Sequence, residues 1–175
     1  PTYRDAIGDV IHRNHRGCGQ VHYTDTSGRN DIAKLKVAET PQGQVAFYAQ
    51  TANFLSPHTD PNWMVLFVNA DARAETGWYG YDLRVNRMVS ADGMRASLDV
   101  WRGSPIAGHW ENVGFVPIRI GAREVELLLP QKHFGSAPLK FEFHWKDNPE
   151  SLDRHPTIQG DDAPERRFNY VFKRQ

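Results

Sequence analysis

Apolar and polar residues alternate at every second position over many short stretches of this chain. A period of two predicts β-strands, because successive side chains of a strand point to opposite faces. Turn-forming glycines, prolines and Asx residues separate the stretches. The pattern predicts strands over 33–37, 44–49, 63–68, 81–86, 95–101, 112–120, 125–129, 139–146 and 168–172.

Three parts of the chain depart from simple alternation. The stretch 63–68 is apolar on both sides, which is typical of a central strand covered on both faces. Residues 130–134 predict one helical turn, because proline suits its first position and Gly135 follows its end. Residues 1–30 are polar and rich in glycine, histidine and arginine, so we expect an irregular N-terminal segment there.

These elements predict an all-β fold of about nine to ten short strands, with turns at the spacing typical of antiparallel sandwiches and barrels. Asp92-Gly93 is a hairpin signal between two of them. A parallel α/β sheet would need crossover helices, and the pattern contains none. We therefore expect one domain over residues 1–175, folded as a two-sheet, jelly-roll-like antiparallel β-sandwich.

Composition narrows the class of ligand. The 175 residues contain 21 Lys plus Arg and 21 Asp plus Glu, so the formal charge is zero. Proteins that hold nucleic acid or anionic membranes by bulk charge are basic, so we expect neither partner. No apolar run approaches the ~20 residues of a membrane-spanning helix. The single cysteine, Cys18, excludes a disulfide scaffold and a zinc site of several cysteines.

Common catalytic motifs are missing from the sequence. It contains no nucleophile elbow, phosphate-binding loop, dinucleotide fingerprint or H-E-x-x-H motif. His12 and His15 would share a helix face, but the glycines around them disfavour a helix, so we interpret them as surface histidines. Cys18 lies between two glycines and is interpreted as a loop thiol. Nothing in these residues calls for an enzyme.

One loop has the composition of a weak calcium site. Oxygen-bearing side chains at Asn69, Asp71 and Glu75 follow a buried strand, and Ca²⁺ prefers six to eight oxygen ligands. Arg73 stands where a further oxygen would help. An ordinary solvated turn is therefore the favoured interpretation, with calcium as the alternative and the one cofactor considered.

Five tryptophans suggest a ligand class. Trp63 and Trp145 lie in predicted strands among large apolar residues, so we expect them in the core. Trp78, Trp101 and Trp110 lie in a loop or at strand ends, where they are either ligand platforms or loop anchors. Exposed aromatic faces stack on the C–H faces of sugar rings, and placed polar groups then bind the hydroxyls.

Two predicted strands have a polar face. If they are neighbours, they form a mixed-charge surface that suits a polyhydroxylated ligand; otherwise they form a solvated sheet face. The polar side chains are Asp82, Arg84 and Asn86 on one strand, and Glu142, His144 and Lys146 on the other.

Five segments, spread from residue 28 to the end, carry a resemblance to a known family. They read GRNDI at 28–32, DPNWM at 60–64, TGWYGYD at 76–82, FHWKDN at 143–148, and GDDAP at 160–164 with RFNY at 167–170. Together they resemble the family 9 carbohydrate-binding modules and their DOMON-like β-sandwich relatives, which are appended to bacterial glycoside hydrolases. The resemblance implies a noncatalytic domain that binds glycan through aromatic and polar side chains, with structural calcium in some members.

The sequence hypothesis is therefore a carbohydrate-binding module of a larger secreted or periplasmic bacterial enzyme. Its expected partners are a polysaccharide or oligosaccharide and a covalently linked catalytic domain. Two alternatives stay open: a structural accessory domain that docks through an apolar patch, and a β-sandwich enzyme. The residues expected to bind glycan are Trp78, Trp101 and Trp110 by stacking, and Arg84, Asn86, Glu142 and His144 by hydrogen bonds; the enzyme would use Arg84, Glu142, His144 and Lys146.

Overall fold

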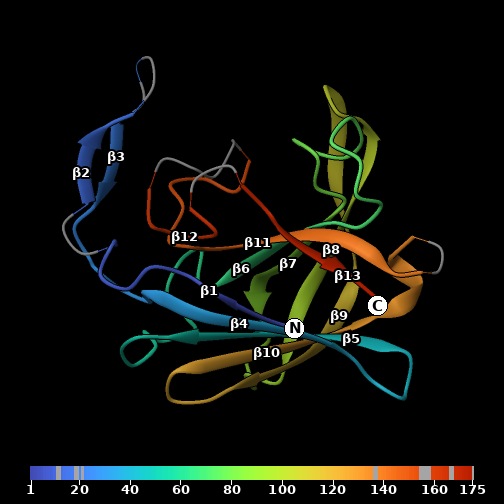
Figure 1. Cartoon of the computed structure of the whole chain (residues 1–175), viewed down its shortest axis with the longest axis horizontal. Coiled ribbons are helices and arrows are strands. Elements are labelled where there is room, and N and C mark those ends of the chain that lie inside the picture. The colour runs from blue at the N-terminus through green and yellow to red at the C-terminus, as the bar shows by residue number, and fades with distance from the viewer. Residues whose placement is uncertain are drawn as a thin grey trace.

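The structure is a computed structural model, and strands dominate it (Figure 1). No helix among the described residues is long and apolar enough to cross a membrane. His12, Cys18 and Arg167 lie outside the described part, so the expectations placed on them are not addressed by the structure. The structure describes residues 1–10, 13–17, 20, 22–135, 138–153, 159–165 and 168–174.

Within those ranges the chain forms thirteen strands and one short 3-10 helix, Gln131–His133. The sequence predicted one helical turn over 130–134 with Pro130 as its first residue; the structure has a 3-10 turn there, but Pro130 is extended and precedes it. The strands are β1 (Thr2–Arg4), β2 (Arg13–Arg16), β3 (His22–Asp25), β4 (Ile32–Glu39), β5 (Gln44–Thr51), β6 (Val65–Asn69), β7 (Leu83–Val89), β8 (Arg95–Ser104), β9 (Ala107–Ile120), β10 (Glu124–Pro130), β11 (Lys140–Asp147), β12 (Asp161–Ala163) and β13 (Tyr170–Lys173).

Eleven of the strands form one continuous sheet in the order β1-β4-β5-β10-β9-β8-β7-β6-β11-β12, with β13 also paired to β11. Every pairing between these strands is antiparallel. β2 and β3 form a separate two-stranded sheet, and this hairpin stands away from the main sheet in Figure 1. Thr24 of β3 also forms an isolated parallel bridge with Gln159. The all-β, antiparallel prediction is confirmed.

The ends of the sheet approach each other and nearly close it. The Tyr3 hydroxyl on β1 donates to the Val171 carbonyl on β13 at 2.9 Å, and the Tyr170 hydroxyl donates to the Arg4 carbonyl at 2.8 Å. β9 is long enough to pair with β8 over most of its length and with β10 at its end. The finer prediction of a two-sheet sandwich is not confirmed, because the eleven strands are continuous in one curled sheet.

The inward face of the curled sheet encloses the main core. Trp63 and Trp145 lie in it, at 3% and 0% exposure, as predicted. β6 is buried on both faces, also as predicted: its second face carries Val65 and Phe67. These two residues pack in a second cluster with Trp78, Tyr81 and Leu152. Loops thus cover the outer face of the sheet around β6.

Candidate functional site

Three of the tryptophans singled out from the sequence line one hollow beside the β8–β9 hairpin. Its volume is about 320 Å³. We call it the aromatic hollow. It brings together four of the seven predicted glycan-binding residues, from the loop before β7, from β7 and from the facing ends of β8 and β9. Its lining residues are Trp78, Arg84, Trp101, Gly108, His109, Trp110 and Asp153.

The tryptophan rings meet edge to face. Trp101 and Trp110 are directly opposite in the β8–β9 register, with ring centroids 5.2 Å apart and planes at 71°. Trp110 and Trp78 are 5.7 Å apart at 69°. Gly108 makes this arrangement possible, because a Cβ there would lie 2.5 Å from the Trp101 ring. Trp101 and Trp110 are partly exposed, whereas Trp78 is buried behind them and acts as a loop anchor.

Arg84 fixes one side of the hollow. Its Nη2 lies 3.0 Å from the Asp99 carboxylate, and its Nη1 donates to the Leu152 carbonyl at 3.0 Å. Burial lowers the pKa of Arg84, and the charge of Asp99 opposes that shift. The guanidinium carbon lies 4.8 Å from the centre of the Trp110 ring, within range of a cation–π interaction. Arg84 therefore supports Trp110 from beneath.

The other three predicted glycan-binding residues lie elsewhere. β6 lies between β7 and β11, so the two polar strand faces are not neighbours, and loops bury much of them. His144 is 1% exposed, with Nδ1 at 2.9 Å from the Phe168 carbonyl and Nε2 at 3.1 Å from Asp162. Glu142 accepts a hydrogen bond from Asn169 at 3.1 Å. Neither Glu142 nor His144 lines the aromatic hollow, and Asn86 lines a different one.

Lys146, another residue of the enzyme alternative, is fully buried. Its Nζ donates to Asp162 Oδ1 at 2.7 Å. Burial alone would raise the pKa of Asp162, but Lys146 and His144 outweigh it and hold this pKa below its ordinary value. These side chains join β11 to β12, and in this structure they are closed to a substrate.

Asp5 has a strongly shifted pKa near the junction of β1 and β13. Burial raises it from 3.8 to about 7, and the charge of Glu165 adds to the rise. The carboxyl therefore stabilises the fold below about pH 4, and this contribution is lost as the pH rises through about 7. We expect Asp5→Asn to unfold at a higher temperature than the wild type at pH 8, and at nearly the same temperature at pH 4.

Thermal melts followed by circular dichroism across this range test the expectation. Glu150→Gln, at an exposed position, is the control and should follow the wild-type curve. A constant difference between Asp5→Asn and the wild type at every pH would contradict the assigned titration.

The 69–75 loop has the geometry of a hydrogen-bonded turn. The Arg73 amide donates to Asn69 Oδ1 and Asp71 Oδ1, both at 3.0 Å. Thr76 also donates to Asp71, and the Arg73 Nε lies 3.0 Å from Glu75. These contacts turn the oxygens considered as weak calcium ligands toward donors of the same loop, in line with the ordinary turn that the sequence favoured.

A different set of carboxylates could hold a cation. Asp9, Asp31 and Asp161 each contribute one oxygen, and the three oxygens lie within 4.8 Å of one another. Hard oxygen ligands of this kind suit Ca²⁺. Asp31 also accepts from the Gly8 amide at 2.8 Å, and Asp161 from the Ile32 amide at 2.7 Å, so both are held in place. The fold brings this triad together from distant parts of the chain.

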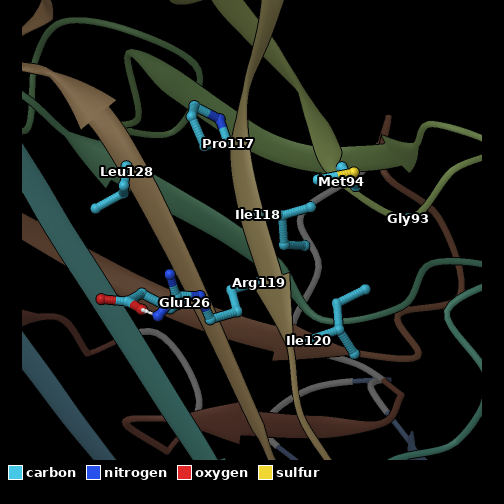
Figure 2. Close-up of a pocket in the computed structure, with 8 residues that line it drawn as sticks. All are labelled: Gly93, Met94, Pro117, Ile118, Arg119, Ile120, Glu126 and Leu128. Carbon is cyan, nitrogen blue, oxygen red and sulfur yellow. Dashed lines mark ion pairs between the residues drawn. The ribbon is translucent and has the colours of Figure 1, made fainter.

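A third feature is an apolar hollow of about 390 Å³ between the β7–β8 turn, β9 and β10 (Figure 2). Two of its lining residues form an ion pair: Arg119 Nη1 lies 3.9 Å from Glu126 Oε2. Val113 and Phe115, further along β9, are also exposed. The hollow is lined by Gly93, Met94, Pro117, Ile118, Arg119, Ile120, Glu126 and Leu128.

Comparison with known proteins adds no family to this description. No protein-family model, no curated protein and no solved structure matches the chain. The functional interpretation therefore depends on the residues and on their geometry.

Proposed function

We propose that this domain is a noncatalytic carbohydrate-binding module and that it binds glycan in the aromatic hollow. The observation that carries the proposal is the pair of partly exposed rings, Trp101 and Trp110, set at 71° beside polar rim residues. Two aromatic planes at a large angle can contact a sugar ring on a face and an edge together. The volume, about 320 Å³, lies at the lower end for ligand sites and suits a short stretch of glycan.

The rim supplies hydrogen-bonding groups. His109 and Asp153 are exposed and line the hollow, so both can reach sugar hydroxyls. Arg84 is already paired with Asp99 and bonded to a backbone carbonyl, so it supports the aromatic platform more than it attracts an anion. A neutral glycan is therefore the favoured ligand of the aromatic hollow.

The wider proposal follows the sequence resemblance. We propose that the curled sheet corresponds to the β-sandwich of the family 9 modules, with β4, β5 and β10 facing β6, β7 and β11 across the core. On this view the domain is part of a secreted or periplasmic bacterial enzyme whose catalytic domain is linked to it. The shared core of these strands supports that arrangement.

Affinity gel electrophoresis against a panel of neutral and acidic polysaccharides tests the binding function. We expect at least one neutral glycan to retard the wild-type domain and Trp101→Ala to bind it about 5- to 150-fold more weakly, the equivalent of about 1–3 kcal/mol. The melting temperature should change little, because Trp101 is partly exposed and lies near the tip of a hairpin.

Phe54→Ala is the matched control, since Phe54 is an exposed aromatic outside the hollow. It should bind as the wild type does. The site would be excluded if no glycan retarded the wild type, or if a glycan retarded Trp101→Ala and the wild type equally.

The apolar hollow favours a second candidate function, docking onto a catalytic partner. Met94 is 67% exposed at its edge, and Phe115 nearby is 45% exposed. Exposed apolar side chains that gather in this way are typical of interaction surfaces. Two results together would favour docking over carbohydrate binding. The wild type would be retarded by no glycan, and Met94→Asp would lose binding to the catalytic partner.

A further inference from the structure

We infer that a second hollow, beside the other half of β7, binds a neutral polyhydroxylated molecule of about one sugar ring. We call it the polar hollow. Its volume is about 330 Å³, and it lies between the loop before β6 and the later part of β7. It shares no lining residue with the aromatic hollow. The lining residues used in the argument are His58, Asp60, Trp63, Asn86, Arg87 and Met88.

The inference depends on Asn86, whose side-chain oxygen is buried without a hydrogen-bond partner among the described residues. The residue is 2% exposed, and its Nδ2 donates to the carbonyls of Trp63 at 3.1 Å and Met64 at 2.9 Å. Because the side-chain oxygen, Oδ1, is buried, a ligand hydroxyl in the hollow reaches it only when the wall of the hollow moves slightly. The hydrogen bond would then recover the about 1–3 kcal/mol that an unpaired buried acceptor costs. The sequence predicted Asn86 as a sugar-binding residue, and the structure places it in this hollow.

The backbone of Asn86 is consistent with a built site. Its φ is +69°, and Asn62, which also lines the hollow, has a φ of +52°. Asparagine adopts this left-handed backbone more readily than most other residues with a side chain, and Asn86 lies where the β7–β8 register is irregular. The two carbonyls bound by Nδ2 hold the Asn86 side chain, so its Oδ1 is preorganised for a donor.

The polar groups of the hollow select the chemical class of the ligand. Asp60 and Asn86 Oδ1 are acceptors, whereas the Arg87 guanidinium is a donor. Asp60 lies 3.3 Å from Arg29 and Arg87 lies 3.3 Å from Asp99, so the charge of each is already balanced within the protein. A carboxylate or phosphate would lie against the acceptors, and an ammonium group would lie against Arg87. A sugar hydroxyl both donates and accepts, so it matches both kinds of partner. Met88, which is 48% exposed, adds an apolar wall for the C–H face of the ring.

Asp99 connects the two hollows. Arg84 of the aromatic hollow lies 3.0 Å from Asp99 Oδ2, and Arg87 of the polar hollow lies 3.3 Å from the same oxygen. The two arginines are three positions apart on β7, a rise of about 10 Å along a strand. The polar hollow therefore has its own ligand contacts but shares a structural support with the proposed glycan site.

NMR of the ¹⁵N-labelled domain can test the two hollows separately, because each contains a tryptophan whose indole N–H is hydrogen-bonded. Trp63 Nε1 donates to the Ser56 carbonyl at 3.0 Å and reports on the polar hollow. Trp101 Nε1 donates to the Ser104 carbonyl at 3.1 Å and reports on the aromatic hollow. The probes are glucose, galactose, mannose and xylose, titrated singly at millimolar concentrations.

We expect at least one of these sugars to shift the Trp63 indole signal in a saturable manner. His58→Ala should weaken that binding about five-fold, the effect of losing one hydrogen bond or ring contact. His15→Ala, an exposed histidine on β2, is the matched control and should bind as the wild type does. Asn86 itself is left unchanged, because its Nδ2 holds two backbone carbonyls.

A Trp63 signal that no sugar moves, or that saturates equally in His58→Ala and the wild type, would overturn the inference. A shift of Trp101 without Trp63 would overturn it while leaving the proposed glycan site intact. A shift of Trp63 without Trp101 would support the polar hollow and count against the aromatic one.

Discussion

Asp162→Asn is expected to lower the free energy of unfolding by about 3–5 kcal/mol, because it removes one charge of a buried ion pair. Asp162 and Lys146 are both 0% exposed, and the Lys146 Nζ lies 2.7 Å from the carboxylate. The asparagine retains a hydrogen-bond acceptor but no longer balances the ammonium charge. Urea unfolding followed by tryptophan fluorescence measures the loss.

The pH dependence gives this prediction a second readout. Because the pKa of Asp162 in the fold lies below 3.8, its stabilising contribution is present above that pH and is lost as the pH falls through the lower value. The difference between Asp162→Asn and the wild type should therefore be constant near neutrality and shrink only in strong acid.

Glu111→Gln is the matched control, because it removes the carboxylate of an exposed ion pair with Arg102. Exposed pairs contribute little, so stability should be nearly unchanged. Similar small effects for both variants would mean that water reaches Lys146, contrary to the packing described.

Gly160→Ala is expected to destabilise the domain by about 3 kcal/mol or more, by combining backbone strain with overpacking. Gly160 has a φ of +81°, and a Cβ at this position would lie 1.9 Å from the Asp147 carbonyl oxygen and 2.7 Å from that of Asn148. Both obstacles are backbone atoms, so no side chain can turn away to make room. The close approach brings the chain into β12 beside the end of β11.

Gly43→Ala separates the effect of backbone strain from that of overpacking. Gly43 has a similar φ of +71°, but nothing lies within 4 Å of a Cβ built there. Strain alone should cost about 1 kcal/mol at this position. Thermal and urea unfolding of both variants give the comparison, and equal losses would show that residue 160 can move away from β11.

Local periodicity was sufficient to predict the strands that have one face in the core. β5 and β10 alternate cleanly between buried and less buried positions, whereas β11 alternates only at its start and is buried on both faces after that. Each of the three was predicted within about two residues. The hairpin turn at Asp92-Gly93 was also predicted correctly. These features depend only on neighbours in the sequence.

The strands that were missed have no apolar alternation. β12 consists of Asp161, Asp162 and Ala163, so only one of its side chains is apolar. It pairs with β11 through the backbone and through the Lys146–Asp162 ion pair. β1 is three residues long, and β2 with β3 is a polar hairpin, so residues 1–30 were predicted as irregular. β1 and β12 form through contacts with distant residues, which local patterns do not encode. The β2–β3 hairpin is local, but its residues lack the apolar alternation that would identify it.

The site was predicted in part for the same reason. Trp101 and Trp110 are at facing ends of consecutive strands, so the β8–β9 hairpin alone brings them together. Asn86 and His144 were grouped with them on the assumption that their strands are neighbours. The insertion of β6 between β7 and β11 separates those strands, and strand order cannot be deduced from periodicity.

The tyrosine hydrogen bonds between β1 and β13 have a consequence for chain topology. They hold Thr2–Arg4 beside Tyr170–Lys173, so the chain enters and leaves the sheet at adjacent points. An arrangement of this kind is compatible with placing the whole domain inside a surface loop of a host protein as well as at one end of it. It also makes the fold a natural scaffold for circular permutation, with new termini at the exposed turn 41–43.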